Sequence, residues 1–260
     1  MTGGGLDDKK LELERYNGRA LRELASGGSI PALRGAKAVP LVYRAPYLEY
    51  ERHIRELVRP GLRVLELGSG AGLHTGVLLD AGAEVTATDI SVNALALLAH
   101  GITDVQARRR FRTQQADMES LPFDDGAFDV VACAGSLSYG DPALVDREIR
   151  RVLVRGGSFV CVDSLNHNPI YRFNRWVHYL RGQRTRSTLL RMPTLFRLES
   201  LTREFEQPEL RFFGSMSWAM GAVAHFVGAI RAAEWSDRID EFVDCRSSAF
   251  KVVVAARNRA

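Results

Sequence analysis

Short apolar runs alternate with segments of helical periodicity through the middle of the chain. The runs are bounded by glycine, proline or charged residues, which is typical of buried strands. We predict strands at residues 64–67, 83–89, 111–116, 128–136 and 158–162. Between them, apolar residues recur at helical spacing, and helices are expected at 73–79, from about residue 92, and at 142–152. Strands that alternate with helices predict an α/β fold with a largely parallel sheet.

The two ends of the chain carry more helical pattern than this core requires. Amphipathic helices are expected at 6–25 and 46–57, and residues 1–60 together are predicted to form an N-terminal helical lid. Residues 61–260 are expected to form the core domain. After its fifth strand the sequence predicts, in order, an inserted segment at 166–193, a helix at 194–205, a strand at 209–213, a helical excursion at 217–244 and a last strand at 249–256.

Composition is that of an ordinary globular protein. Of the 260 residues, 46% are hydrophobic and 25% are charged, which supplies enough apolar material for one substantial core. The three cysteines, Cys133, Cys161 and Cys245, show no metal-ligand spacing, and no acid cluster indicates a metal. The N-terminus has no secretory pattern, and the longest apolar run, 218–230, is shorter than the roughly 20 residues that span a bilayer. We therefore expect a cytoplasmic protein with no bound metal and no transmembrane segment.

Positive charge is concentrated in one segment. The formal net charge is +4, yet residues 166–198 contain seven arginines and no lysine, aspartate or glutamate. Two interpretations stay open. The arginines either meet an anionic ligand, including one held at an anionic membrane, or they are solvated while the neighbouring aromatic side chains pack inward.

Three glycines follow the first predicted strand at alternate positions. The pattern Glu66-x-Gly68-x-Gly70-x-Gly72 ends a strand and precedes a helix. Glycine suits a turn that needs positive φ values and a close approach between ligand and backbone. A dinucleotide-binding turn would need glycine or alanine three residues after Gly70, where Leu73 stands. The pattern instead resembles motif I of the class I S-adenosylmethionine-dependent methyltransferases.

This resemblance implies a Rossmann-like, seven-stranded, mostly parallel sheet with helices on both faces, and S-adenosylmethionine as cofactor. Asp89 lies 23 residues beyond Glu66 and would accept hydrogen bonds from the ribose hydroxyls. Its alternative role is to cap the next helix, which Ser91 can also do. Asp117 and Met118 would contact adenine. The residues expected at the cofactor are Glu66, Gly68, Ser69, Gly70, Gly72, His74, Thr75, Asp89, Ile90, Asp117, Met118, Ala134, Gly135 and Ser136.

The resemblance also places an acceptor molecule between the N-terminal helices and the 166–193 insertion, which would cap it. The residues expected to contact the acceptor are Tyr16, Tyr43, Tyr47, Tyr171, Arg172, Arg175 and Trp176. Packing between helices is the alternative role for each of the N-terminal tyrosines. The acceptor is expected to be a small molecule, anionic in one interpretation, such as a sugar, a glycan intermediate or a natural product.

Methyl transfer needs the alignment of nucleophile, methyl carbon and sulfur more than it needs catalytic side chains. A hydroxyl acceptor benefits from a general base, and His167 follows the fifth strand, where open α/β sheets bind ligands. Asp163 is expected to orient His167, and Tyr139 to orient the acceptor; alternatively, His167 is an ordinary loop residue. We predict methyl transfer to a hydroxyl, with N-methyl transfer to an amine or a non-catalytic cofactor-binding scaffold as alternatives.

Nucleic acid is not an expected partner. The loop after the fourth strand reads Ala-Gly-Ser-Leu-Ser-Tyr, without the Asn/Asp-Pro-Pro-Tyr motif of the DNA amino-methylating enzymes that this family includes. The Pro-Cys pair needed for carbon methylation of cytosine is also missing from the sequence. The 217–244 excursion is expected either to roof the acceptor pocket or to form the contact of a homodimer.

Overall fold

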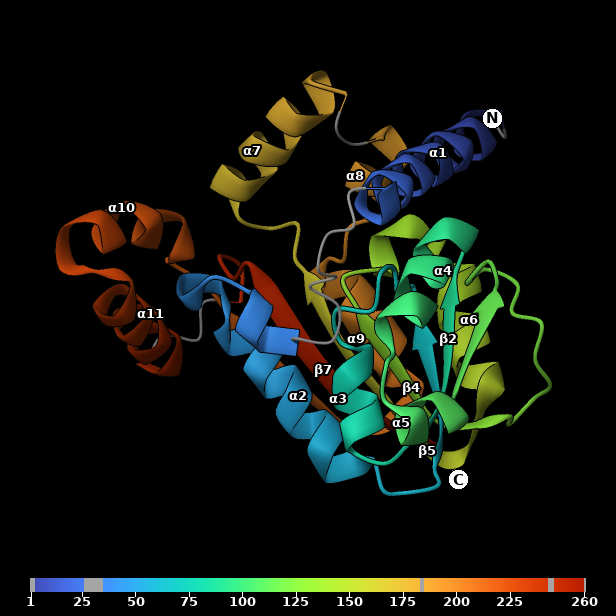
Figure 1. The fold of residues 1–260 in the computed structure, drawn as a ribbon. Helices are drawn as coiled ribbons and strands as arrows, with labels where there is room; N and C mark the ends of the chain where they lie inside the picture. Colours follow the sequence, from blue (N-terminus) through green and yellow to red (C-terminus); the bar gives the residue numbers. More distant parts are fainter. Residues whose placement is uncertain (1–2, 26–34, 183–184, 243–245, 260) are drawn as a thin grey trace.

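The computed structural model describes residues 3–25, 35–182, 185–242 and 246–259, which are organised around one seven-stranded sheet (Figure 1). The strands are β1 (Arg63–Leu67), β2 (Glu84–Asp89), β3 (Phe111–Gln115), β4 (Phe128–Ala134), β5 (Leu153–Ser164), β6 (Phe205–Phe213) and β7 (Lys251–Asn258). Their order in the sheet is β3-β2-β1-β4-β5-β7-β6. The first five strands run parallel, and β7 lies antiparallel between β5 and β6. The predicted Rossmann-like fold is confirmed.

Helices cover both faces of the sheet and its carboxyl edge. They are α1 (Gly3–Ala25), α2 (Ala45–Leu57), α3 (Thr75–Asp80), α4 (Val92–Gly101), α5 (Val105–Arg109), α6 (Pro142–Val152), α7 (Pro169–Leu180), α8 (Arg186–Leu190), α9 (Leu195–Arg203), α10 (Ser217–Val227) and α11 (Ala229–Phe242), with short 3-10 turns η1 (Gly35–Ala38), η2 (Leu41–Tyr43) and η3 (Leu137–Tyr139). Two strands begin earlier than predicted, β5 at Leu153 and β6 at Phe205. At both places the register shifts, so pairing continues through a bulge that interrupts the alternation of side chains.

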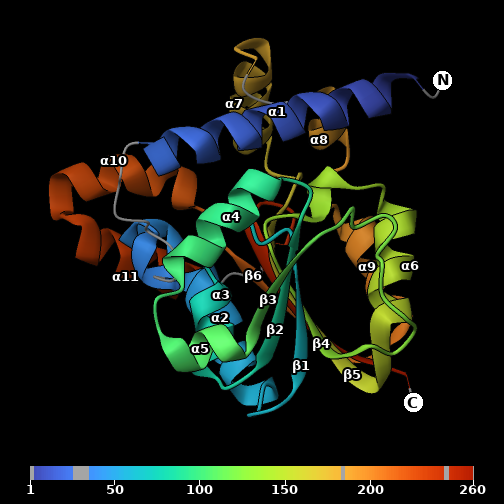
Figure 2. The ribbon, with the colours of Figure 1, turned by 45° about the vertical axis from the view of Figure 1, so that its right-hand side comes forward.

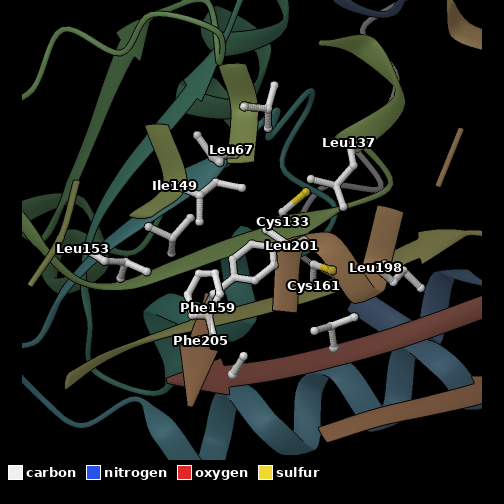
Figure 3. Close-up of a cluster of buried hydrophobic side chains, with 14 of the residues drawn as sticks. Leu67, Cys133, Leu137, Ile149, Leu153, Phe159, Cys161, Leu198, Leu201 and Phe205 are labelled. Carbon is white, nitrogen blue, oxygen red and sulfur yellow. The ribbon is translucent and has the colours of Figure 1, made fainter. Parts of the chain in front are cut away.

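Two hydrophobic cores lie on opposite faces of the sheet, because successive strand residues point to opposite sides. Phe159 and Cys161 of β5 pack with α6 and α9 (Figure 3), whereas Val160 and Val162 pack with α2 and α3. Cys133 lies beside Cys161, and burial raises the pKa of the Cys133 thiol to about 12. Both cysteines are therefore neutral, small apolar groups of the core.

Helix α1 crosses the carboxyl ends of the parallel strands (Figure 2). Polar contacts hold it there. Asn17 Oδ1 accepts a hydrogen bond from Ser91 Oγ (2.6 Å), and Lys9 Nζ lies 2.7 Å from carboxylate oxygens of both Asp117 and Glu119. The predicted lid thus begins with a helix over the edge at which open α/β sheets bind ligands.

The segments after β5 form helices that stand away from the sheet (Figure 1). The 166–193 insertion contains α7 and α8, and the 217–244 excursion contains α10 and α11, apart from 243–245, which lie outside the described residues. Helices α10 and α11 pack on each other and contact η2. Within the described ranges, no helix is both long and apolar enough to cross a bilayer.

Candidate functional site

A pocket lies at the carboxyl ends of β1, β2 and β4, and residues of α1 and α8 also line it. It gathers most of the residues that the sequence predicted for the cofactor. These are Gly68, Ser69, Gly70, Asp89, Ile90, Asp117, Met118, Ala134, Gly135 and Ser136. Tyr16 and Tyr139 also line it, together with six residues that the sequence did not single out: Lys9, Glu12, Thr88, Ala116, Ser187 and Thr188.

The glycine loop forms the floor of this pocket. Gly68 and Gly70 have φ values of 62° and 53°, which side chains rarely adopt. A Cβ at Gly68 would lie 2.5 Å from Ser136 Cβ, whereas a Cβ at Gly70 would have nothing within 4 Å. Ser69 Oγ is buried and has no hydrogen-bond partner among the described residues. The loop therefore has an open side at Gly70 and an unused polar atom beside it, as expected where a ligand meets the backbone.

Asp89 ties the glycine loop to the end of β2. Gly70 N donates to Asp89 Oδ2 (2.9 Å), and Ser91 N donates to Asp89 Oδ1 (2.8 Å). Burial raises the pKa of Asp89, while these backbone donors oppose the rise. The N-cap of α4 is Ser91, whose Oγ accepts from Ala94 N (3.1 Å). The capping role is thus filled by Ser91, and the Asp89 carboxylate faces the pocket.

Glu66 and Thr75 lie below the loop and do not line the pocket. Thr75 Oγ1 donates to Glu66 Oε2 (2.6 Å), and both side chains are buried. Burial raises the pKa of Glu66 to about 7. Gly72 is also outside the pocket lining, because it packs against Leu98 of α4, where a Cβ would lie 2.1 Å from Cδ1. In this structure the three residues support the loop from beneath, and their contact with the cofactor stays a prediction.

The raised pKa of Glu66 gives a test of its burial below the glycine loop. Because its folded-state pKa is raised above 4.5, the folded protein holds this proton over a pH range in which the unfolded chain releases it. Stability should fall by about 2–3 kcal/mol as the pH rises from 4.5 through 7. In Glu66→Gln this part of the pH dependence should vanish. Urea unfolding of both proteins at pH 5 and at pH 8 measures it, and equal pH slopes would contradict the assignment.

His74 is a packing residue in this structure. It precedes α3, stacks on Tyr47 with ring centroids 5.2 Å apart and meets the edge of Tyr50 at 5.6 Å. Burial lowers the pKa of His74 to about 4, so the ring is neutral. His74 Nδ1 and the Tyr50 hydroxyl are both buried without a partner among the described residues. His74 does not line the pocket, and its contact with the cofactor stays a prediction.

The far end of the pocket is closed by residues of α1. Asp117 and Met118 line it after β3, as predicted, but Asp117 Oδ2 is also paired with Lys9 Nζ. Glu12 Oε1 accepts from Thr185 Oγ1 (2.9 Å) and Thr188 Oγ1 (3.0 Å). Helix α1 therefore connects the loop after β3 with α8 across the pocket.

Tyr16 and Tyr139 meet inside the pocket, although 123 residues separate them in sequence. Their hydroxyl oxygens are 2.5 Å apart and their rings pack edge to face. Burial, followed by the proximity of Tyr139, raises the pKa of Tyr16 far above its ordinary value. The pair is therefore neutral near pH 7 and can donate or accept hydrogen bonds.

The other predicted acceptor residues form a second cluster, outside the pocket. Tyr171 stacks on Phe250 with centroids 4.1 Å apart, and Tyr43 approaches the same ring at 6.1 Å. Arg175 is buried and donates to Leu165 O (2.6 Å), so it braces α7 against the end of β5. The side chains of Arg172 and Trp176 are exposed on α7. In this structure Tyr171 and Arg175 pack against neighbouring segments, and Arg172 and Trp176 lie on the surface. Their contacts with an acceptor stay predictions.

The predicted catalytic pair does not form. His167 Nε2 accepts a hydrogen bond from Leu195 N (2.7 Å), which uses the lone pair that a general base needs. The buried Asp163 carboxylate accepts from Leu137 N (2.9 Å) and Ser164 N (2.6 Å). Among the described residues no hydrogen bond joins Asp163 to His167: His167 Nε2 binds the first backbone N–H of α9, and Asp163 fixes the loop after β4.

Comparison with known proteins finds similarity to methyltransferases. Residues 65–161 match a family model described as a methyltransferase domain. The demethylmenaquinone methyltransferase of Mycolicibacterium gilvum is 36% identical over 130 residues, which make up 47% of this chain and 52% of that protein. The ubiquinone biosynthesis O-methyltransferase of Pseudomonas aeruginosa is 35% identical over 112 residues, 42% of this chain and 47% of that protein. The chain thus spans about half the length of these curated relatives.

A solved structure shows the same fold over most of the chain. The geranyl diphosphate C-methyltransferase from Streptomyces coelicolor, in complex with Mg²⁺, geranyl diphosphate and S-adenosyl-L-homocysteine, has a TM-score of 0.57 at 17% identity. The likeness covers 83% of this chain and 80% of that chain. At 17% identity, this similarity is evidence for a shared fold alone.

The fold and the match over residues 65–161 support the resemblance to class I S-adenosylmethionine-dependent methyltransferases that the sequence predicted. S-adenosylmethionine is the cofactor of that class. The residues present fit this cofactor, because Gly70 leaves room at the backbone, Ser69 Oγ is unpaired and Asp89 faces the pocket. The matched residues 65–161 run from β1 into β5, so the family match covers the pocket floor, whereas α1 and α7 to α11 lie outside it.

Proposed function

We propose that this protein transfers the methyl group of S-adenosylmethionine to a small-molecule acceptor. The observation that carries the proposal is the pocket where the glycine loop, Asp89 and Asp117 meet below α1. The sulfonium of the donor supplies an electrophilic methyl group, so the chain has to bind, orient and exclude water. Calorimetry with the donor, followed by a methyl-release assay on an acceptor panel, tests this. Donor binding without turnover on any acceptor would favour a scaffold.

The donor contacts are proposed from the geometry of the pocket. Each oxygen of Asp89 accepts one backbone N–H, which leaves lone pairs for the two ribose hydroxyls. Asp117 and Met118 are proposed for the adenine, as the family resemblance implies. Ser69 Oγ is the unused donor nearest the loop and is proposed for the polar end of the methionine moiety.

We propose a hydroxyl of a phenol-like ring as the acceptor group. The neutral Tyr16–Tyr139 pair can orient such a hydroxyl by hydrogen bonding, but it offers no base near pH 7. A phenol-like hydroxyl ionises more readily than an alcohol, so it depends less on a base. The two relatives named above are, by their names, a demethylmenaquinone methyltransferase and an O-methyltransferase of ubiquinone biosynthesis, which supports a ring-bearing acceptor over the expected sugar.

The burial and charge of Lys251 are evidence for an anionic acceptor. This residue begins β7, pairs in register with Ser164 and is only 7% exposed. Its Nζ lies 4.9 Å from the centre of the Tyr47 ring and forms no ion pair with any described residue. Burial raises the pKa of Asp163, and the nearby Lys251 ammonium opposes the rise. Lys251 does not line the pocket and lies beside the Tyr47 and Phe250 rings. A buried ammonium without a carboxylate within ion-pair distance is costly, so we propose that an anionic group of the acceptor extends beyond the pocket and pairs with it.

Lys251→Met should separate acceptor binding from folding. We expect kcat/KM for 3,4-dihydroxybenzoate to fall about tenfold, because one hydrogen bond to a charged group is lost. The neutral analogue 3,4-dihydroxybenzyl alcohol should be methylated equally by both proteins, and donor affinity should not change. Unfolding stability should be equal or higher, since a buried charge is replaced by an apolar chain. A destabilised variant with an unchanged benzoate-to-alcohol ratio would assign Lys251 a structural role instead.

A further inference from the structure

Helix α7 presents an apolar stripe to solvent. Its members are Ile170, Phe173, Trp176 and Leu180, whose side chains are 43%, 65%, 51% and 62% exposed. Their spacing of three or four residues places them along one side of the helix. Large apolar side chains scattered singly on a surface are ordinary, whereas four in one row on a single helix form a surface that favours an apolar partner.

The opposite side of α7 holds the helix in place. Tyr171 stacks on Phe250 and hydrogen-bonds to Ser217 of α10, and Arg175 donates to Leu165 O. The direction of the exposed stripe is therefore fixed by contacts on the inner face. Figure 1 shows α7 rising beyond the sheet on the side where α1 and α8 cover the pocket.

Positive charge flanks the stripe. Arg172, Arg181 and Arg186 are exposed, and none of them forms an ion pair with a described residue. Arg184 lies outside the described residues. Residues 166–198 themselves contain no acid, and the nearby carboxylates Asp8 and Glu12 of α1 bond to Ser187 and Thr185 rather than to these arginines. Exposed aromatic and aliphatic side chains beside unpaired arginines are the pattern of helices that lie in a membrane interface.

We propose that α7 docks the protein on an anionic membrane surface. The helix of 12 residues is too short to span a bilayer, so it lies in the plane of the interface. Phe173 and Trp176 enter the headgroup region, and the arginines meet lipid phosphates. Docking itself does not depend on methyl transfer. Its benefit rests on the proposed function, because it brings the pocket edge beside lipid in which an apolar acceptor dissolves.

A second copy of the chain complements this surface less well than an anionic membrane does. In a two-fold contact each patch meets itself, so α7 would pair with α7 and the flanking arginines of both copies would approach each other. Like charges at such a contact oppose association. An anionic membrane instead complements both the apolar and the basic part of the surface.

Flotation of the full chain with vesicles tests the proposal. We expect binding to vesicles of equal parts phosphatidylcholine and phosphatidylglycerol, and much less to pure phosphatidylcholine. Phe173→Glu with Trp176→Glu should lower the partition coefficient at least about tenfold, since one large apolar side chain contributes this much. Arg172→Gln with Arg181→Gln should lower it about fivefold per arginine, and only on the anionic vesicles.

Phe196→Glu is the matched control, because Phe196 is an exposed aromatic (79%) on α9, away from α7. It should bind vesicles as the unmodified chain does. All variants should keep their circular dichroism and donor affinity. The proposal is overturned if the α7 variants bind as well as the control, or if anionic lipid makes no difference. It is also overturned if ultracentrifugation without lipid finds a dimer that Phe173→Glu dissociates, which would assign the stripe to a second copy.

Discussion

Asp89→Ala should weaken binding of S-adenosylmethionine about 100-fold or more, with the fold intact. In the proposed site two ribose hydroxyls donate to this carboxylate, and a hydrogen bond to a charged group contributes about 1.5–3 kcal/mol. The substitution also releases Gly70 N, which donates to Asp89 Oδ2 (2.9 Å), so the loop loses this hydrogen bond to β2. Isothermal calorimetry measures the loss. Asp89→Asn can still accept from Gly70 N. Its donor affinity should therefore lie between those of Asp89→Ala and the unmodified chain.

Asp104→Ala provides the control for this measurement. Asp104 caps α5 and accepts from Ala107 N (2.6 Å), so it too is an acid that bonds to a helix N-terminus after a loop. It does not line the pocket. Its replacement should cost about 1 kcal/mol of stability and leave donor affinity unchanged. If Asp89→Ala and Asp104→Ala bound the donor equally well, the proposed ribose contact would be refuted.

Gly70→Ala should reduce donor affinity to a similar degree, for a different reason. A Cβ at this position meets no protein atom within 4 Å, so the space that it would fill is open to the pocket. A methyl group there would occupy the volume in which the donor is expected to touch the backbone. The positive φ of 53° adds strain of about 1–2 kcal/mol to the folded state.

Gly61→Ala is a control that separates the effect of backbone strain from the effect of a methyl group that fills the pocket. Gly61 has a φ of 83°, and a Cβ there also meets nothing within 4 Å, but the residue precedes β1 at the opposite edge of the sheet. Both variants should lose comparable stability in urea unfolding. Only Gly70→Ala should lose donor affinity in calorimetry, and a donor affinity equal to that of Gly61→Ala would show that nothing binds against this loop.

Much of the fold could be predicted from the sequence because its strands and helices have clear periodicity. The predicted helix 46–57 and the observed α2, Ala45–Leu57, differ by one residue, and Asp141 and Pro142 mark the start of α6 correctly. The starts of β5 and β6 were missed because a bulge breaks the period-two pattern without ending the pairing. Gly156 and Gly157 lie inside β5, ahead of the predicted strand start at residue 158.

The candidate site was predictable where it depends on backbone conformation. Gly68, Gly70 and Asp89 are fixed by one strand-loop-helix unit, so their spacing sufficed. Thr88 and Ala116 directly precede predicted site residues and could have been found by position. Contacts between segments that are far apart in the sequence could not be predicted in this way. No local pattern shows that Tyr16 meets Tyr139, or that Leu195 N takes the lone pair of His167.

The way α1 is attached has a consequence for turnover. Lys9, Glu12 and Tyr16 all line the pocket from above, so a molecule leaving on that side has to displace the helix. The ion pairs of Lys9 with Asp117 and Glu119 are partly exposed, and such pairs contribute little to stability. Helix α1 is also held by the buried hydrogen bonds of Glu12 with Thr185 and Thr188, and by Ala20, which packs against α4. None of these contacts belongs to the two cores of the sheet, so a molecule that passes on this side has to break polar and apolar contacts of α1 but not those cores.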